Sequence, residues 1–170
     1  MNKRLKSLCF SGHKSEKLPQ SKEGLERLQK RLNEEIDKAI EDGVNKFYFG
    51  ACYGFDLMCA NEILRRKKVI NFKKPKFIKL IAVIPYEEQA ILWNEENREL
   101  YYNILGKCDD VITLNTKYKQ GCYYRRNRFM VDRTSRLICY YNGGGGITGY
   151  IVNYAKKCDL QIVNLYAKKE

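Results

Sequence analysis

The last third of the chain contains Leu137-Ile138-Cys139-Tyr140-Tyr141-Asn142-Gly143-Gly144-Gly145-Gly146-Ile147-Thr148-Gly149, an apolar strand pattern that runs into four consecutive glycines. The amphipathic stretch 150–157 follows and predicts a helix. Because glycine has no Cβ, such a loop lets a ligand approach its backbone N–H groups. A helix that begins behind the loop adds free N–H groups and a partial positive charge. The sequence therefore predicts a phosphate-binding loop here.

Gly144, Gly146 and Gly149 match the pattern G-x-G-x-x-G of dinucleotide-binding proteins. That fingerprint belongs in the first strand–helix–strand unit, with an acidic residue about 20 positions further on for the ribose. Here the glycines lie late in the chain, which disfavours a standard NAD site. A plain flexible turn is an alternative, although four glycines cost more conformational entropy than an ordinary connection requires.

The composition predicts one folded cytoplasmic domain spanning residues 1–170. An apolar fraction of 44% with 12% aromatics excludes general disorder. The seven cysteines form no C-x-x-C pair and several fall in apolar strand patterns, which is typical of buried thiols in a reducing compartment. His13 is the only histidine, so we expect no metal site. No apolar stretch is long enough for a signal peptide or a membrane span, and we expect no membrane partner.

The net charge of +12 is the one unusual feature of the composition. A basic chain has nucleic acid, an anionic membrane surface or a small phosphorylated ligand as possible partners. Most of the lysines are spread thinly, which is typical of a solvated surface. The arginines are more concentrated, and a short stretch interleaved with aromatic residues holds Arg125, Arg126, Arg128, Arg133 and Arg136.

Predicted strands and helices alternate along the whole chain. Strand patterns cover 5–10, 44–49, 77–84, 111–114, 136–141 and 160–165. Helical patterns cover 25–40, 57–64, 91–104, 123–134 and 150–157, and we expect Asp56 to cap the second of these helices. The alternation predicts an α/β fold with a mostly parallel central sheet that helices cover on both faces.

Three loops after predicted strands are rich in glycine or small residues: Ser11-Gly12, 50–54 and 143–146. Ligands of open α/β sheets bind beyond the carboxyl ends of the strands, near the point where the strand order reverses. The coincidence of three such loops supports a ligand site better than any one of them. We therefore expect the three loops to form a single phosphate cradle.

Five short motifs resemble one known family in order and spacing over nearly the whole chain. They are Phe10-Ser11-Gly12-His13; Gly50-Ala51-Cys52-Tyr53-Gly54-Phe55-Asp56-Leu57-Met58; Ile84-Pro85-Tyr86-Glu87-Glu88-Gln89 with Trp93; Arg126-Asn127-Arg128-Phe129-Met130-Val131-Asp132; and the glycine loop with Tyr150. Together they are similar to the YpsA-like branch of the SLOG superfamily. The resemblance implies a Rossmann-like three-layer sandwich and a pocket for nucleotides or nucleotide-derived ligands.

The predicted ligand-binding residues lie in these motifs. His13 is suited to a phosphate or a base edge, with an exposed loop histidine as the alternative. Arg126 and Arg128 suit bidentate phosphate contacts, and because they point apart on a helix, we expect only one to face the pocket. A ring at Tyr53 or Phe55 is suited to stacking on a base, whereas Trp93 is either core or pocket wall. The full set is Ser11, Gly12, His13, Lys14, Gly50, Ala51, Tyr53, Gly54, Phe55, Pro85, Arg126, Asn127, Arg128, Gly143, Gly144, Gly145, Gly146 and Thr148.

Catalysis has less support than binding. Lonely-Guy phosphoribohydrolases, relatives in the superfamily that cleave an N-glycosidic bond, carry P-G-G-x-G-T-x-x-E. Aligning this signature on the glycines or on Thr148 places Tyr150 or Ile151 where the glutamate belongs. Hydrolysis of this type needs a carboxylate for the developing cation or the attacking water. Asp56 and Glu62 remain the candidate catalytic acids, with helix capping and surface pairing as their respective alternatives.

Three functions follow from these patterns. The first is binding of a nucleotide-derived small molecule, as a sensor or a sequestering protein, without an obligatory cofactor. The second is hydrolysis of the N-glycosidic bond of a nucleoside monophosphate. The third is binding of single-stranded nucleic acid, as in DNA-processing protein A, another relative. A homodimer is also expected.

Overall fold

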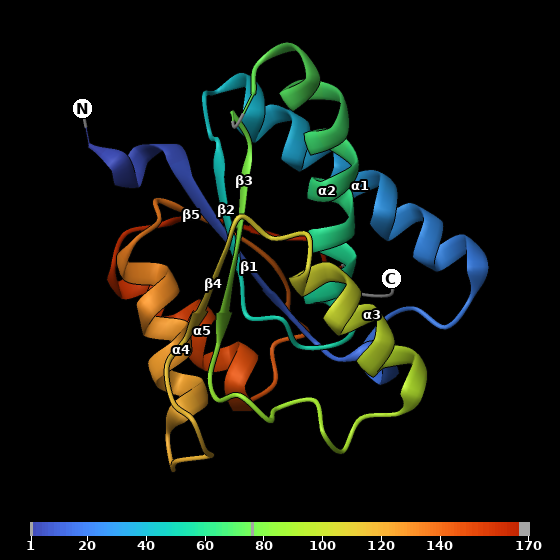
Figure 1. Ribbon diagram of the computed structural model, residues 1–170, viewed down its shortest axis with the longest axis vertical. Helices are drawn as coiled ribbons and strands as arrows, with labels where there is room; N and C mark the ends of the chain where they lie inside the picture. Colours follow the sequence, from blue (N-terminus) through green and yellow to red (C-terminus); the bar gives the residue numbers. More distant parts are fainter. Residues whose placement is uncertain (1, 76, 167–170) are drawn as a thin grey trace.

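The computed structural model describes residues 2–75 and 77–166. Six strands in this part form one sheet of order β4-β3-β2-β1-β5-β6, and every neighbouring pair is parallel (Figure 1). The predicted α/β fold is confirmed, and the sheet is parallel throughout. The strands are β1 (Ser7–Gly12), β2 (Lys46–Phe49), β3 (Lys79–Ile84), β4 (Asp110–Thr113), β5 (Arg136–Tyr140) and β6 (Gln161–Asn164).

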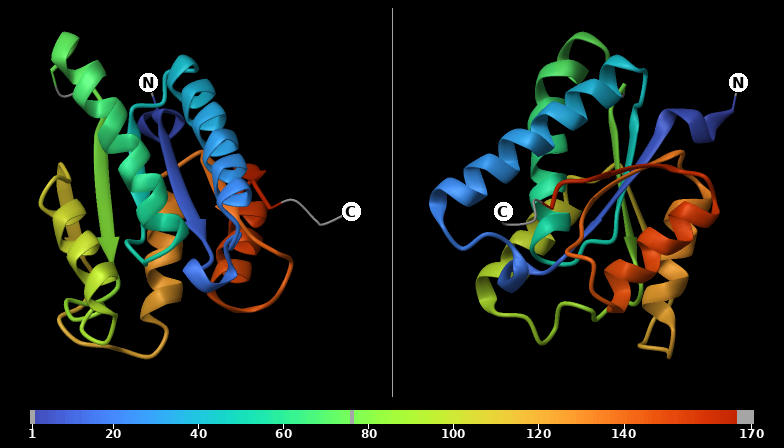
Figure 2. Two further views of the ribbon diagram at one scale, coloured as in Figure 1. Left: turned by 90° about the vertical axis from the view of Figure 1, so that its right-hand side faces the viewer. Right: turned by 180° about the vertical axis from the view of Figure 1, so that it is seen from behind.

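Helices cover both faces of the sheet, which makes three layers (Figures 1 and 2). One face carries α1 (Lys22–Glu41), α2 (Phe55–Lys73) and α3 (Glu95–Leu105). The opposite face carries α4 (Cys122–Asp132) and α5 (Gly146–Lys157). Two short 3₁₀ helices, Lys3–Lys6 and Ser15–Lys17, flank β1. Among the described residues, no helix combines the length and the apolar composition that crossing a bilayer requires.

Each face of the sheet has its own apolar core. On α1, the helical spacing of Leu28, Leu32 and Ile36 places all three against the sheet, where they are buried. Burying each such side chain fully stabilises the fold by roughly 1.5–3 kcal/mol. On the other face, Val131 and Ile151 pack against the strands together with Cys9, Leu137 and Cys139. All seven cysteines are free thiols and four are buried, as predicted.

Some predicted boundaries are wrong, and local capping explains two of them. The first strand begins at Ser7 instead of residue 5, because Lys3–Lys6 form a 3₁₀ helix that Asn2 caps by accepting a hydrogen bond from the Arg4 amide. The third long helix begins at Glu95 instead of residue 91. Asn94 caps it, since its Oδ1 accepts the Asn97 amide at 2.9 Å.

The fifth helix begins earlier than predicted, at Gly146 instead of residue 150. Gly146 and Thr148 therefore belong to its first turn and are not part of a free loop. Gly149 is the next helical residue and is closely packed: a Cβ there would lie 2.8 Å from the Gly144 carbonyl oxygen. The helix thus starts directly behind the glycine run and points its amino end at the ligand side of the sheet.

Strand order places the three small-residue loops next to one another. β1 lies between β2 and β5, so the carboxyl ends of these three strands are adjacent. The chain leaves β1 toward α1 on one face and leaves β5 toward α5 on the other. The boundary between β1 and β5 is therefore the point at which the strand order reverses, where open α/β sheets bind ligands.

Candidate functional site

His13 joins the loops that follow β1 and β5. Its side chain is buried, and its Nε2 accepts the Asn142 amide at 3.1 Å. An accepting Nε2 places the proton on Nδ1. Burial lowers the pKa of His13 below its ordinary value, which favours this neutral form. The alternative of an exposed loop histidine is thus wrong: His13 is buried and connects the two loops.

Phe55 is a core residue rather than a stacking surface. Its ring is fully buried, and a Cβ on Gly12 would lie 2.6 Å from its Cγ. Of the two rings predicted for base stacking, Phe55 is therefore excluded, because Gly12 covers its ring. Tyr53 is half-buried, donates a hydrogen bond to Glu16 Oε1 at 2.9 Å and lies below the Lys14 ammonium. Tyr53 and Lys14 remain accessible, whereas Ser11, Ala51 and Pro85 are buried.

The loop after β2 holds backbone conformations that L-residues rarely adopt. Ala51 has a φ of 58°, and Gly54 has a φ of 96°. The Ala51 carbonyl accepts a hydrogen bond from the buried Gln89 side chain. A non-glycine residue in this region costs of order 1–3 kcal/mol and persists only where the surroundings enforce it. Such strain concentrates at functional sites, which agrees with the position of this loop beside the reversal of strand order.

Asp56 does not cap α2, contrary to the prediction. Gly54 occupies the capping position, and Asp56 lies in the first turn with its Oδ2 3.3 Å from the Cys52 amide nitrogen. The carboxylate is 4% exposed, and its Oδ1 accepts no hydrogen bond from the described residues. Burial raises the pKa of Asp56 to about 6, against the opposing effect of the Arg126 charge. Asp56 therefore holds its proton to a higher pH than an exposed aspartate does.

Arg126 and Asn127, both predicted to contact a ligand, are buried and bound to protein groups. Arg126 Nη1 donates to the Gly50 carbonyl at 2.7 Å, and its Nε donates to Asn127 Oδ1 at 2.9 Å. Asn127 Nδ2 donates to the Ile147 carbonyl at 3.2 Å. Their exposed fractions are 4% and 0%. These side chains bind the backbone of the loop after β2 and of the first turn of α5, and they do not face solvent.

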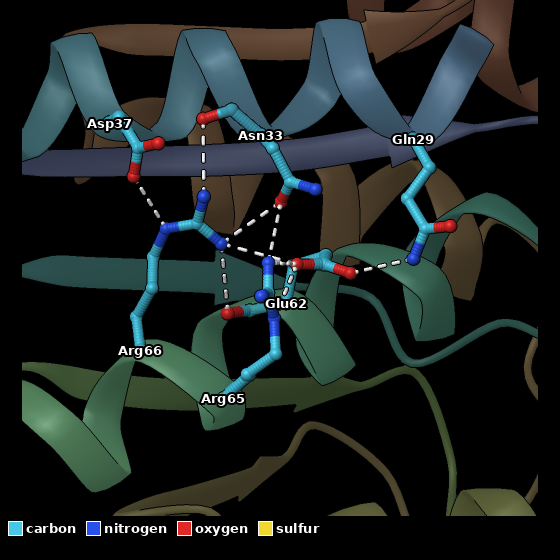
Figure 3. A network of polar contacts seen from close by, with 6 residues as sticks. All are labelled: Gln29, Asn33, Asp37, Glu62, Arg65 and Arg66. Carbon is cyan, nitrogen blue, oxygen red and sulfur yellow. Dashed lines mark hydrogen bonds and ion pairs between the residues drawn. The ribbon is translucent and has the colours of Figure 1, made fainter. Parts of the chain in front are cut away.

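Glu62 joins α1 to α2 and has no free oxygen for chemistry (Figure 3). Its Oε1 accepts Gln29 at 2.8 Å, and its Oε2 accepts Arg65 at 2.7 Å and Arg66 at 3.2 Å. Burial opposes ionisation, yet these donors together hold the pKa of Glu62 below its ordinary value. Arg66 continues the network to Asn33 and Asp37 on α1. The network makes Glu62 a helix-pairing residue, and its engaged carboxylate is not suited to the role of catalytic acid.

A pocket of about 430 Å³ lies between the amino ends of α4 and α5, and we call it the glycine-loop pocket. The residues that line it come from the glycine run, α4, α5 and the end of β5. They are Gly121, Tyr124, Arg128, Tyr141, Gly144, Gly145, Gly146, Gly149, Tyr150 and Asn153. The loops after β1 and β2 do not line it. The three loops are neighbours, but the expectation that they form a single cradle is wrong for this pocket.

The glycine-loop pocket combines anion-binding groups with aromatic rings. α5 starts behind Gly145 with no capping side chain and no acidic residue in its first turn. Its free N–H groups and its dipole therefore favour a negative ligand group. Arg128 Nη1 donates to the Tyr150 hydroxyl at 2.7 Å. The Tyr150 ring meets the Tyr124 ring edge-on, with centroids 4.6 Å apart.

The tyrosines of this pocket were missed in the sequence-based prediction. Helical spacing is the signal that would have found them, because residues four apart share one face. Tyr124 and Arg128 have this spacing on α4, and Gly146 and Tyr150 have it on α5. Tyr141 gives no such signal, since its hydroxyl reaches the pocket by donating to the Gly144 carbonyl within the loop.

Curated bacterial proteins are similar in sequence to most of this chain. A UPF0398 protein of Bacillus thuringiensis (strain Al Hakam) is 29% identical over 137 residues, which cover 79% of this chain and 72% of the relative. A UPF0398 protein of Bacillus pumilus (strain SAFR-032) is 24% identical over 143 residues, or 81% of this chain and 74% of the relative. These relatives are similar along most of both chains.

Solved structures share the fold at low sequence identity. DNA processing protein A (DprA) of Streptococcus pneumoniae superposes with a TM-score of 0.60 at 15% identity, over 93% of this chain and 49% of that one. DNA processing protein A of Helicobacter pylori gives 0.57 at 12% identity, over 94% and 64%. A sequence model named YpsA and described as the YspA SLOG family matches residues 8–166. The chain therefore belongs to the YspA SLOG family.

Proposed function

We propose that this protein binds a nucleotide or nucleotide-derived small molecule in the glycine-loop pocket, as a sensor or a sequestering protein. The observation that carries the proposal is the start of α5, which is uncapped, free of acidic residues and open to the pocket. Such a helix end favours an anionic group, and phosphate is one that it binds well. Membership of the SLOG family and the position beside the reversal of strand order support the same assignment.

Two further groups give the pocket its expected selectivity. Arg128 is exposed on α4 and offers a guanidinium to a phosphate that sits on the α5 amides. Tyr124 is 40% exposed and presents a ring on which a base would stack. The ligand in this proposal therefore carries at least one phosphate and one aromatic base.

The residues of the pocket favour binding of the ligand without its hydrolysis. None of the residues that line it is acidic. Asp56 is the remaining candidate acid, and its carboxylate is enclosed among Cys52, Arg126 and the β1 loop. An N-glycosidase would need a carboxylate at the ligand. Release of free base from AMP by the wild type, abolished by Asp56→Asn, would support the enzymatic alternative.

Single-stranded nucleic acid is a second candidate ligand, favoured by a row of rings that runs from α4 along α5. Tyr124 meets Tyr150 edge-on, and Tyr150 stacks on Tyr154 with an interplanar angle of 4°. Successive aromatic rings beside basic residues suit the bases and the backbone of a single strand. The Helicobacter pylori structure is described as showing a single-stranded DNA binding mode. Such binding must weaken steeply with salt, so salt-insensitive binding to an oligonucleotide argues for the small molecule.

The test is a thermal-shift panel of nucleoside mono- and diphosphates, NAD-derived metabolites and cyclic nucleotides, followed by calorimetry. At least one member should raise the melting temperature, because a ligand that binds only the folded state stabilises it. Arg128→Ala should weaken that binding about tenfold or more, since a hydrogen bond to a charged group contributes roughly 1.5–3 kcal/mol. Arg125→Ala is the matched control: it removes the same charge one turn away, outside the pocket lining.

Two results would overturn the proposal. One is the absence of any melting shift across the panel, supported by calorimetry. The other is an equal loss of affinity in Arg125→Ala and Arg128→Ala, because that would indicate attraction to overall charge and not a pocket contact.

A further inference from the structure

A continuous chain of side chains links the loop after β2 to the start of α5. Arg126 donates to the Gly50 carbonyl at 2.7 Å and to Asn127 at 2.9 Å, and Asn127 donates to the Ile147 carbonyl at 3.2 Å. Gly50 directly follows the last residue of β2, whereas Ile147 lies in the first turn of α5. These two carbonyls are 97 positions apart in sequence, yet both accept hydrogen bonds from adjacent residues on α4.

The hydrogen bonds of Arg126 and Asn127 have little freedom to rearrange. A Cβ on Gly50 would lie 2.6 Å from Arg126 Cζ, so the guanidinium fits against bare backbone. Arg126 is 4% exposed, and the negative charge of the nearby Asp56 carboxylate compensates its buried positive charge. Asn127 is fully buried and uses its amide oxygen for Arg126 and its amide nitrogen for Ile147. Losing either carbonyl leaves a buried donor unpaired, which is costly.

Holding a carbonyl also aims the amide on the other side of the same peptide group. The peptide unit is planar and trans, so its C=O and its N–H point in opposite directions. Asn127 therefore sets the direction of the Thr148 N–H, which is one of the free donors in the first turn of α5. Arg126 sets the direction of the Ala51 N–H in the same way.

We propose that Arg126 and Asn127 are positioning residues that couple the loop after β2 to the anion-binding amides at the start of α5. This inference rests on the proposed function, because the Thr148 amide belongs to the same helix start. Neither side chain lines the glycine-loop pocket, so their effect on a bound phosphate passes through the two backbone carbonyls. A ligand that orders the start of α5 accordingly orders the loop after β2 as well.

The fluorescence of Trp93 provides a readout that a purely structural role of Arg126 and Asn127 would not change. Trp93 is the only tryptophan of the chain, and its ring lies 5.1 Å from that of Tyr53 in the loop after β2. Trp93 does not line the glycine-loop pocket. Excitation near the red edge of tryptophan absorption avoids the adenine ring, so ADP can serve as the probe. A change of Trp93 emission on ADP binding thus reports the loop after β2 and not direct contact.

In the wild type we expect ADP to change Trp93 emission with the same midpoint that calorimetry gives for binding. In Asn127→Ala, ADP affinity should fall about tenfold, and the emission change at saturation should be lost. Asn103→Ala is the matched control, because Asn103 is exposed on α3, and it should behave as the wild type. Arg126→Lys covers the case in which Asn127→Ala does not fold: lysine keeps the charge, but its single ammonium cannot span both acceptors.

The outcomes separate the two proposals. If ADP does not bind the wild type, the nucleotide of the panel that raises the melting temperature most replaces it, and binding by no member of the panel counts against the proposed function. ADP binding to the wild type without an emission change refutes the coupling alone. Unchanged affinity and an unchanged emission response in Asn127→Ala, or in Arg126→Lys if only that variant folds, refute it as well.

Discussion

Replacing Gly54 with alanine is expected to destabilise the protein by more than about 4 kcal/mol, a large share of the total stability of a domain. Gly54 has a φ of 96°, where an L-residue is strained. The new Cβ would also lie 2.6 Å from the Ser15 nitrogen and 2.7 Å from the Lys14 carbonyl carbon. Both are backbone atoms, so relief requires moving the loop after β1. Urea unfolding followed by circular dichroism measures the loss.

Gly43→Ala separates the clash from the backbone strain. Gly43 has nearly the same φ, 92°, but a Cβ there meets nothing within 4 Å. This variant should lose only about 1–2 kcal/mol, which is the cost of the left-handed conformation. Equal losses at the two positions would show that the loops after β1 and β2 are not in the close contact described above. A much larger loss at Gly54 would establish that contact in solution.

The second large effect is a pH dependence of stability that Asp56 causes. Its pKa rises from 3.8 to about 6 on folding, chiefly through burial. The folded state therefore binds this proton more tightly than the unfolded state. The stabilisation is fully present below the unfolded pKa and is lost as the pH rises through the folded pKa. The full effect is about 3 kcal/mol, with a slope of about 1.4 kcal/mol per pH unit between pH 4 and 6.

Asp56→Asn removes the titration and nearly keeps the shape of the side chain. We therefore expect the unfolding free energy of the wild type, relative to that of Asp56→Asn, to rise as the pH falls from 6 to 4. Using the difference cancels the other carboxylates, such as Glu62, whose pKa shifts in the opposite direction. Urea unfolding at several pH values in this range provides the curves. Parallel curves for the two proteins would contradict a buried carboxyl with a raised pKa at position 56.

The strands were predictable because a parallel sheet covered on both faces needs continuous apolar runs. The stretch 136–141 shows such a run, and β5 occupies all of it but the last residue. The start of α5 was not predictable, since Gly146 and Gly149 are poor helix formers and read as loop. Side-chain contacts decide it: Asn127 on α4 donates to the Ile147 carbonyl, and Tyr141 donates to the Gly144 carbonyl within the loop.

The site was predictable in position but not in the orientation of its side chains. Parallel strands alone bring the three loops to one edge of the sheet. Whether Arg126 or Arg128 faces the ligand depends on Gly50, which has no side chain and leaves the space that the Arg126 guanidinium fills. Phe55 is buried for the same reason, because Gly12 leaves room for its ring. No local pattern reveals partners that are about 40 to 80 positions away.

Amide chemical shifts, followed by NMR during an ADP titration, test the site most directly. Glycine amides resonate in a separate nitrogen region, so the glycine loop can be observed without interference. We expect the largest, saturable shifts at Gly145, Gly146, Ile147 and Thr148, with smaller shifts at Ala51 through the α4 contacts. The absence of shifts at these amides, or a saturable response confined to another surface, would contradict a phosphate site at the start of α5.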